Sequence, residues 1–529
     1  AFIFDTLCMA RAVHGVDAGG SLAALAKRYA LGEKGVEVVN AFGKRLQDFT
    51  IEQLLRYGQY CLNDVELTYK LFHKLAQGFP ESELNLIDMT IRMFTEPKLV
   101  IDDALLVERL EQVKNEKHGL LGGLMQELSC ETEEDVRATL ASNKKFAELL
   151  TARGVTVPMK VSPTTGKMVP ALAKNDEGFL LLQEEGDPLT QQLCAVRLGT
   201  KSTIEESRLQ RFIETASRNN GRLPIPLKYY GAHTGRWSGS DGINLQNLPS
   251  RDAKKKALKS ALCAPDGYVI VNCDSSQIEA RVLAWLAGQT DVVDQFARGE
   301  DVYSIFASKI YGRPISKADP VERFVGKTCV LGLGYGTGAE KLRLTLKTSP
   351  PGADLDRDLC DSYVRLYRQV NHAIPALWNE CDRALDAMLA GGKTEFSLGS
   401  PKNIVFWSGT HGIRLPNGLY IRYNNLRAEN GRKIYDSRKG SIGVWGGVMV
   451  ENIVQALARI IVGEQMLQLK EAGYTPVLTV HDAAVCLVPE DNVEAAVQTI
   501  TRIMSTAPDW CASLPVACEA KFGKSYGVC

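Results

Sequence analysis

The fold is decided by one stretch of the chain, Tyr268-Val269-Ile270-Val271-Asn272-Cys273-Asp274-Ser275-Ser276-Gln277-Ile278-Glu279-Ala280-Arg281. Its β-prone and mostly apolar start predicts a strand that is buried on both faces. Ser276 and Glu279 then have the spacing of a capping box, so a helix is expected to follow. Asp274 therefore stands where a buried strand ends and a helix begins, a position that suits a metal ligand. On this stretch alone, an ordinary strand–helix turn containing an aspartate is an equally good interpretation.

The composition bounds the class of protein. With 529 residues, the chain is expected to hold ~3–4 domains. Hydrophobic residues make up 45% and charged residues 23%, as in globular proteins, and no run approaches the ~18 apolar residues of a membrane span. The 13 cysteines contain no C-x-x-C pair, which argues against a zinc ribbon and against a secreted disulfide framework. This cysteine usage fits a reducing compartment. The formal net charge of zero requires any polyanion to bind a local basic surface.

Apolar periodicity and Pro/Gly breakers predict the other elements. In chain order we expect an α-rich region over 1–90, a long amphipathic helix over 91–150, a loop or hairpin over 158–170, helix over 185–218, loops over 224–250, helices over 290–395 with breaks at Pro314 and 349–352, a turn at 416–419, a helix over 448–469, a hairpin over 475–488 and a closing strand over 515–521. The protein is therefore expected to be multidomain α/β, with a sheet assembled from distant segments.

A second acid lies in the predicted hairpin, Val477-Leu478-Thr479-Val480-His481-Asp482-Ala483-Ala484-Val485-Cys486-Leu487-Val488. Two apolar strands flank His481 and Asp482, so Asp482 is expected at the hairpin tip. A carboxylate beside a dry core is costly unless it is compensated, and a divalent cation compensates it well. Two such acids at strand ends suggest a paired-metal site for phosphoryl transfer. The alternative is a common turn aspartate.

A third stretch, 323–336, combines two cations with an aromatic residue. Gly326-Lys327-Thr328 is not a P-loop, because Val321 stands where that motif needs glycine. As a helix, the stretch places Arg323 and Lys327 one turn apart, about 6 Å along the axis, and Leu331 and Tyr335 continue the same stripe. Such a face could hold a triphosphate at one end and a base at the other. The alternative is a solvated basic face.

In this order the three stretches resemble motifs A, B and C of the family A (DNA polymerase I-like) DNA polymerases. The resemblance extends to Thr234-Gly235-Arg236-Trp237-Ser238, to Asn244-Leu245-Gln246-Asn247-Leu248-Pro249, to Lys201-Ser202-Thr203 and to Val450-Glu451-Asn452-Ile453-Val454-Gln455-Ala456. It covers essentially all of residues 90–529 and is closer to phage-type members than to the bacterial repair enzyme.

The resemblance implies a right-hand polymerase fold with a partial RNase H-like exonuclease domain in front of it. The implied domains are a partial 3′–5′ exonuclease-like domain over 1–90, a thumb over 91–223, the first part of the palm over 224–289, fingers over 290–440 and the second part of the palm over 441–529. The implied reaction is template-directed addition of deoxynucleotides to a primer 3′-OH by two-metal-ion phosphoryl transfer, with release of pyrophosphate. Its cofactors would be two Mg²⁺ ions, for which Mn²⁺ could substitute. Its partners would be primer–template DNA and dNTPs, in the cytoplasm of a bacterium or a phage-infected host and without a membrane.

The resemblance also implies roles for single residues. Asp274, Asp482 and the Ser275 carbonyl would bind the metal ions, and Lys327 would protonate the leaving pyrophosphate. The implied nucleotide-binding residues are Arg323, Lys327, Leu331, Tyr335, Glu279, Gln277 and Tyr303. Glu279 would close off the space for a 2′-hydroxyl. The implied DNA-binding residues are Arg236, Gln455, His481, Asn247 and Lys201. The first three would contact the minor groove or the primer end, where side-chain donors can check pair geometry without reading sequence.

Four positions depart from the family pattern. Leu331 stands where the family has Phe or Tyr, and Ala483 stands where many members have Glu. Tyr303 replaces a phosphate-contacting His, and Glu451 replaces an Asn of the bacterial relative. None of these changes removes a metal ligand, so activity is expected.

The start of the chain resembles half of a second site. Tyr60-Cys61-Leu62-Asn63-Asp64 matches the Y-x3-D third motif of a DEDD-type exonuclease. The other carboxylates would lie upstream of Ala1, so we expect a fragment without exonuclease activity. Either the chain is truncated, or another chain supplies the rest. A separate processivity factor is a further expected partner.

Two rival functions are considered. A single-subunit RNA polymerase shares an analogous palm, but Glu279 and the segment from Thr234 to Pro249 argue against it. A catalytically silent DNA-clamping protein is disfavoured because both Asp274 and Asp482 are intact.

Overall fold

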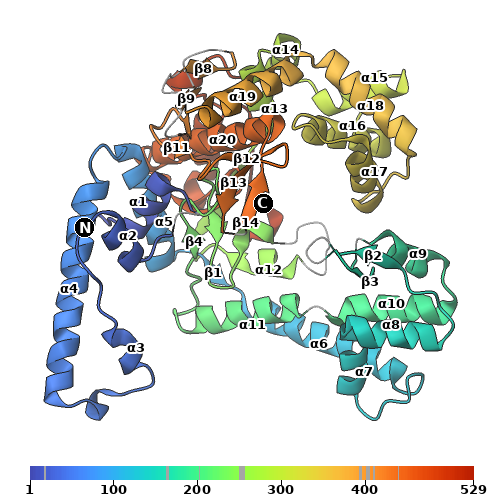
Figure 1. Ribbon diagram of the computed structural model, residues 1–529, viewed down its shortest axis with the longest axis horizontal. Coiled ribbons are helices and arrows are strands. Elements are labelled where there is room, and N and C mark those ends of the chain that lie inside the picture. The colour runs from blue at the N-terminus through green and yellow to red at the C-terminus, as the bar shows by residue number, and fades with distance from the viewer. Residues whose placement is uncertain are drawn as a thin grey trace. The chain divides into compact units, whose positions relative to one another are not determined.

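The structure is a computed structural model that describes residues 1–16, 19–162, 166–174, 176–201, 203–248, 256–391, 396–400, 405–408, 412–438 and 440–529. The chain divides into two compact units, and Figure 1 labels many of their elements. Unit 1 comprises Ala1–Leu99, Pro224–Asn247 and Ala264–Cys529, and unit 2 comprises Val100–Leu223 and Leu248–Cys263. The predicted division into exonuclease-like domain, thumb, palm and fingers is finer than this and stays a prediction.

Unit 2 is mostly helical. Its elements are β1 (Val100–Ile101), α6 (Asp103–Met125), α7 (Glu133–Ala141), α8 (Asn143–Ala152), β2 (Met159–Val161), β3 (Met168–Pro170), α9 (Glu177–Glu185), α10 (Pro188–Lys201), α11 (Ile204–Ser217), α12 (Ala257–Ser260) and β6 (Leu262–Cys263). β1 pairs with β6, and β2 pairs with β3 as the hairpin predicted over 158–170. Phe146, Phe179 and Leu193 are fully buried in the core of this unit.

The single helix predicted over 91–150 is wrong, because capping residues interrupt the apolar periodicity. Thr132 accepts the backbone N–H of Asp135 and starts α7, and Ser142 accepts that of Lys145 and starts α8. An N-cap side chain satisfies a backbone donor that has no partner inside the helix. The apolar periodicity alone does not indicate these caps, although Thr132 and Ser142 are residue types that commonly cap helices.

A four-stranded antiparallel sheet organises unit 1. It is built from β7 (Tyr268–Ser275), β15 (Pro476–Val480), β16 (Ala483–Pro489) and β17 (Cys518–Gly523), in the order β15-β16-β7-β17. The central position of β7 explains its apolar sequence, since Ile270, Val271 and Cys273 are fully buried. The predictions of a buried strand, of a hairpin and of a sheet assembled from distant segments are confirmed.

Helix α20 (Gly446–Glu471) is the core helix of unit 1 and packs against α13 (Ile278–Ala287), α19 (Ala373–Leu389) and α21 (Val493–Met504). Among the described residues it is the one helix long and apolar enough to span a membrane, with a mean hydropathy of 1.3. Of that apolar stretch, 78% is buried inside the protein, as in the core helix of a globular domain. Its composition is thus explained by packing.

Helices and small sheets complete the middle and end of unit 1. They are α13 (Ile278–Ala287), α14 (Thr290–Ala297), α15 (Val302–Tyr311), α16 (Pro320–Leu333), α17 (Ala339–Thr348), α18 (Arg357–Val370), α19 (Ala373–Leu389), β8 (Phe396–Leu398), β9 (Val405–Ser408), β10 (Gly412–Arg414), β11 (Tyr420–Ile421), β12 (Arg427–Glu429), β13 (Arg432–Ser437), β14 (Gly440–Gly443), η3 (Glu490–Asn492), α21 (Val493–Met504), η4 (Asp509–Cys511) and η5 (Tyr526–Val528). The predicted breaks near Pro314 and 349–352 separate α15 from α16 and α17 from α18. The predicted turn at 416–419 joins β10 to β11.

The start of unit 1 is α-rich, as predicted. It contains α1 (Thr6–His14), α2 (Leu22–Arg28), α3 (Glu37–Ala41), η1 (Leu46–Asp48), α4 (Ile51–Leu75) and α5 (Glu81–Thr95), and the segment Pro224–Asn247 adds β4 (Leu227–Lys228), β5 (Ser238–Gly239) and η2 (Leu245–Asn247).

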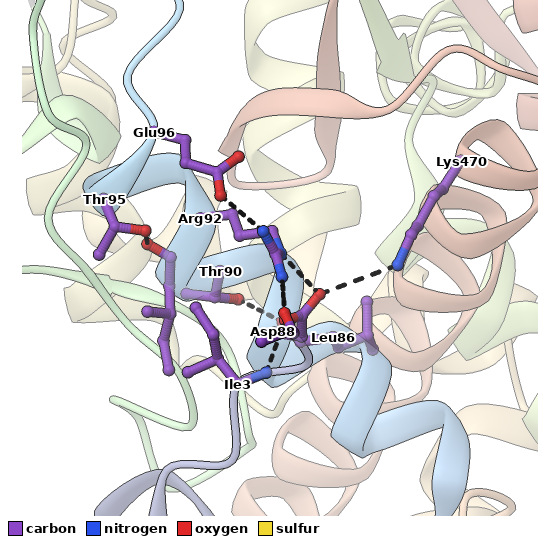
Figure 2. A network of polar contacts seen from close by, with 10 residues as sticks. Ile3, Leu86, Asp88, Thr90, Arg92, Thr95, Glu96 and Lys470 are labelled. Carbon is purple, nitrogen blue, oxygen red and sulfur yellow. Dashed lines mark hydrogen bonds and ion pairs between the residues drawn. The ribbon is translucent and has the colours of Figure 1, made fainter.

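Figure 2 shows that buried Asp88 on α5 contacts residues from distant segments of the chain. It accepts the backbone N–H of Ile3 at 2.9 Å, pairs with Arg92 at 3.0 Å and lies 4.0 Å from the Nζ of Lys470 on α20.

Candidate active site

The two aspartates singled out in the sequence come together at one end of the sheet. β16 pairs with β7 so that Ala483 lies directly opposite Asp274. Asp482 precedes Ala483 in the two-residue loop between β15 and β16. The backbone N–H of Ser275 donates to the carbonyl of Asp482 at 3.2 Å. The Asp274 side chain is exposed and that of Asp482 is 21% exposed, so a ligand can reach both carboxylates.

Arg236 links the second aspartate to Glu279 on α13. Its guanidinium donates to the Glu279 carboxylate, and its Nη2 lies 3.3 Å from Oδ1 of Asp482. Burial raises the pKa of the Glu279 carboxyl, Arg236 opposes this, and the charges of Asp482 and Glu451 add to the rise. Arg236 therefore pairs with two acids, Glu279 and Asp482.

The capping box predicted from Ser276 and Glu279 is wrong. The N-cap of α13 is Gln277, which has a left-handed backbone at φ +56° and makes no side-chain cap bond. The backbone N–H of Ser276 donates to the carbonyl of Ala517 instead. Glu279 is thereby left to face Arg236, a partner from a segment about 40 residues earlier that local spacing could not indicate.

The predicted basic face forms on α16. Arg323 donates from Nε to Oδ2 of Asp301 at 2.6 Å, and its guanidinium lies 5.6 Å from the ring centroid of Tyr303. The Nζ of Lys327 lies 6.0 Å from the same ring. Burial raises the pKa of the Tyr303 phenol to about 12, so the ring stays neutral beside the two cations. Gly326 lets α16 approach α15 closely, because an added Cβ would strike the Tyr303 carbonyl.

The helical stripe ends earlier than predicted. Leu331 is on α16 and is 38% exposed, but the helix stops at Leu333. The backbone N–H of Tyr335 donates to the carbonyl of Gly332, which makes a tight turn at the helix end. Burial and the charges of Glu279 and Glu451 raise the pKa of the Tyr335 phenol well above its usual range. Tyr335 thus lies near Glu279, although not as a further turn of α16.

The aspartate pair fits Mg²⁺. Within the parts of the chain that the structure describes, no group of three or more His, Cys, Asp or Glu side chains is placed to hold a metal ion. Mg²⁺ does not need such a group, because it is commonly bound by one or two carboxylates together with substrate phosphates and water. Asp274 and Asp482 supply two carboxylates at adjoining strand ends, which suits that mode of binding.

A family model described as DNA polymerase family A matches residues 107–393, more than half of the 529-residue chain. The chain belongs to DNA polymerase family A. The family, the polymerase fold and the enzyme class predicted from the sequence are thereby confirmed.

Family A relatives match beyond that range. The DNA polymerase of Bacillus phage SP02 is 25% identical over 522 aligned positions, covering 90% of this chain and 76% of that protein. DNA polymerase I of Pseudomonas aeruginosa is 24% identical over 542 positions, covering 99% of this chain and 53% of that protein. The thermostable DNA polymerase I of Thermus aquaticus is 24% identical over 342 positions, covering 65% of this chain and 36% of that protein. The chain spans about half or less of these two bacterial relatives.

The family A fold is also found among solved structures. The chain resembles the POL domain of Pol1 from M. smegmatis, solved in complex with DNA primer-template and dNTP, with a TM-score of 0.71. The likeness covers 99% of this chain and 82% of that one at 20% sequence identity.

The predicted DNA-binding residues of the family A chain lie in several places. Gln455 on α20 donates from Nε2 to Glu451 at 3.2 Å and accepts the hydroxyl of Thr234 at 3.3 Å. His481 is exposed in the hairpin loop, next to Asp482. Asn247 is exposed at the end of η2. Gln277, which was predicted to bind the nucleotide, forms a side-chain hydrogen bond with Tyr303. Lys201 ends α10 in unit 2, and its side chain lies outside the described residues. Their roles, like those of the other site residues, stay predictions.

Three residues near this site were not predicted to act in it. Asp301 orients Arg323, as described above. Glu519 on β17 lies directly opposite Asp274 and pairs with Lys521 at 3.2 Å. Gln246 contacts the hairpin that carries Asp482. Gln246 lies in the segment Asn244–Pro249, which carries part of the family resemblance. Nothing in the sequence indicated the partners of Asp301 or Glu519.

The predicted exonuclease remnant lies on α4. The Nζ of Lys34 donates to the hydroxyl of Tyr60 at 2.7 Å and forms an ion pair with Asp64. The ammonium also lies 4.6 Å from the centroid of the Tyr60 ring. Lys34 therefore joins the two residues whose spacing matched the third exonuclease motif, and their role in that motif stays a prediction.

Proposed function

We propose that this family A chain carries out template-directed DNA synthesis, adding deoxynucleotides to a primer 3′-OH by two-metal-ion phosphoryl transfer. The observation that carries the proposal is the placement of Asp274 and Asp482 on adjoining strand ends, joined by the bond from Ser275 to Asp482. The family membership supports the reaction class, and the primer-template and dNTP bound to the M. smegmatis relative support these as the ligands.

In the proposed reaction, the primer 3′-oxygen attacks the α-phosphorus of the incoming nucleotide. The bond from that phosphorus to the bridging oxygen breaks, and pyrophosphate leaves. Asp274, Asp482 and the Ser275 carbonyl would hold Mg²⁺. Two such ions, when bound, would favour deprotonation of the 3′-hydroxyl and stabilise the charge on the attacking and leaving oxygens.

The side chains of α16 suit the triphosphate. Arg323 and Lys327 lie one helical turn apart, and both guanidinium and ammonium groups bind phosphate oxygens. Among the described residues Lys327 has no ion-pair partner, so its ammonium can donate to a phosphate and pass a proton to the leaving pyrophosphate. Asp301 holds Arg323 in place before any ligand contact.

Glu279 and Tyr335 would form the wall beside the sugar and base. Arg236 fixes the Glu279 carboxylate, which would exclude a 2′-hydroxyl by occupying its space. Gln455, whose amide is oriented by Glu451 and Thr234, would reach the minor groove together with Arg236 and His481.

Exonuclease activity is not proposed for this chain. The expected location is the cytoplasm of a bacterium or of a phage-infected cell.

Primer extension separates this proposal from its rivals. We expect the protein to extend a primed template with dNTPs and Mg²⁺, and to incorporate rNTPs far less efficiently. Efficient extension with rNTPs would favour an RNA polymerase. DNA binding without extension by either nucleotide set would favour a silent clamping protein and would contradict the proposal.

A further inference from the structure

Strand β15 lies at the edge of the four-stranded sheet, so within the described parts of the chain one side of its backbone has no neighbouring strand. Thr479 pairs with Ala484 and Val480 with Ala483 in the two-residue hairpin. Two backbone groups on the side away from β16 are the carbonyl of Thr479, in β15, and the N–H of His481, in the loop that follows.

Gln246 bonds both of these groups with its side-chain amide. Its Nε2 donates to the carbonyl of Thr479 at 2.7 Å, and its Oε1 accepts the backbone N–H of His481 at 2.6 Å. The residue is only 8% exposed, so water does not compete freely for either bond. One glutamine side chain thus joins the edge of β15 to the loop that follows it.

The segment that carries Gln246 is itself held firmly. The backbone N–H of Gln246 donates to Oδ1 of Asn244 at 3.1 Å, and the neighbouring Leu245 is 1% exposed. A side chain fixed in this way loses little further conformational freedom on making its two bonds. The clamp is therefore built into η2 and does not depend on a mobile loop.

The clamped backbone is the part of the hairpin that aims Asp482. His481 has φ +52°, in the left-handed region that non-glycine residues rarely adopt. Such a conformation persists where the surroundings determine it, and Gln246 bonds the N–H of this residue. The next residue in the chain is Asp482.

We propose that Gln246 is a positioning residue, whose amide holds the His481 turn and thereby keeps the Asp482 carboxylate beside Asp274. The role of Asp482 in this inference rests on the proposed function. The clamp itself does not, because it can be measured as protection of the hairpin backbone.

Two variants with matched chemistry test the proposal. Gln246→Met keeps the length of the side chain and removes both bonds. Gln465→Met is the control, because Gln465 on α20 is also buried and donates to two backbone carbonyls, those of Met504 at 3.0 Å and Thr506 at 3.1 Å. Both variants lose buried amide bonds, but only the first lies against the aspartate hairpin.

The first measurement is single-nucleotide incorporation at varied Mg²⁺. For Gln246→Met we expect kcat to fall about tenfold or more and the Mg²⁺ concentration for half-maximal rate to rise several-fold, because a misplaced carboxylate binds the ion poorly. The KM for dNTP is expected to stay within about threefold. Gln465→Met should keep the wild-type kcat and the wild-type Mg²⁺ requirement, even if its Tm falls by as much as that of Gln246→Met. Equal kinetic losses in both variants, or no loss in Gln246→Met, would overturn the proposal.

The second measurement is amide hydrogen exchange of the peptide covering 477–486. We expect faster exchange in Gln246→Met than in wild type or Gln465→Met, and unchanged exchange would overturn the clamp. If wild type itself fails to extend primers, the proposed function fails, while this measurement still decides the clamp. Should Gln246→Met not fold, Gln246→Glu replaces it, since it keeps an acceptor for His481 and lacks a donor for Thr479 when ionised.

Discussion

The backbone N–H of Ser275 donates to the backbone carbonyl of Asp482 at 3.2 Å. This bond joins the end of the central strand β7 to the hairpin loop that carries the second aspartate. Because β16 also pairs with β7 along seven consecutive residue pairs, the sheet fixes the base of the two-residue loop that carries Asp482.

Removal of the Glu279 side chain should weaken discrimination against ribonucleotides. Glu279→Ala opens the space beside Tyr335 and leaves Asp482 as the remaining ion-pair partner of Arg236 among the described residues. We expect the ratio of kcat/KM for dATP over ATP to fall by about tenfold or more, an effect of the size that a lost steric or hydrogen-bonding contact produces. The control is Glu340→Ala, which removes an exposed acid on α17 that pairs with Arg343 and should leave the ratio unchanged. An unchanged ratio in Glu279→Ala would show that Glu279 is not at the sugar.

The same carboxylate should make stability depend on pH. Its raised pKa in the folded state means that, at intermediate pH, the folded protein binds a proton that the unfolded chain has released. The ionised Glu279 thus lowers stability above the folded-state pKa, and this cost disappears as the pH falls to about 4.3, the ordinary glutamate pKa. Glu279→Gln is therefore expected to be more stable than wild type at pH 7, with a smaller difference at pH 5. Urea midpoints at the two pH values measure this, and a difference that grows on acidification would contradict it.

Replacement of Arg323 should weaken nucleotide binding. A charged hydrogen bond contributes about 1.5–3 kcal/mol, so Arg323→Ala is expected to raise the KM for dNTP by roughly 10- to 100-fold. Arg313→Ala is the matched control, because Arg313 pairs with Asp319 and Glu322 on the exposed start of the same helix region. Similar KM values for both variants would remove Arg323 from the triphosphate site.

The ion pair between Glu83 and Arg459 should dominate the stability of the segment that carries Arg236. Both side chains are buried, and the Arg459 guanidinium lies 4.6 Å from the centroid of Trp237 and 4.9 Å from that of Tyr230. Loss of one partner leaves an unpaired buried charge, so Glu83→Gln is expected to cost about 3–5 kcal/mol in unfolding free energy. Chemical denaturation measures this.

The exposed pair of Glu66 and Lys70 provides the control for that experiment. Glu66→Gln should leave the unfolding midpoint close to that of wild type, since exposed ion pairs contribute little. Equal effects of the two substitutions would show that the Glu83–Arg459 pair does not hold the segment.

The elements of the site could be predicted where local pattern determines them. The apolar run over 268–273 predicted β7, the two apolar strands around His481 predicted the hairpin, and the spacing of Arg323 and Lys327 predicted one face of α16. Each of these signals lies within a window of about 15 residues, in which strand alternation and helix periodicity are expressed.

The contacts that complete the site could not be predicted, because they join distant segments. Glu279 had the spacing of a cap partner but bonds Arg236, and Gln246 bonds a hairpin more than 200 residues later. Gln277 starts α13 in a left-handed conformation that no helix-start rule indicates. A cap can also be missed locally, as Thr132 and Ser142 show in the stretch predicted as one helix.

The most direct test of the central claim compares primer extension by wild type and by Asp482→Ala under Mg²⁺, with primer–template affinity measured on the same preparations. We expect wild type to extend the primer and Asp482→Ala to show no extension, while its affinity for primer–template stays within a few-fold, since the lost carboxylate acts on the metal ions and not on the duplex. Extension by Asp482→Ala at a rate near that of wild type would contradict the account.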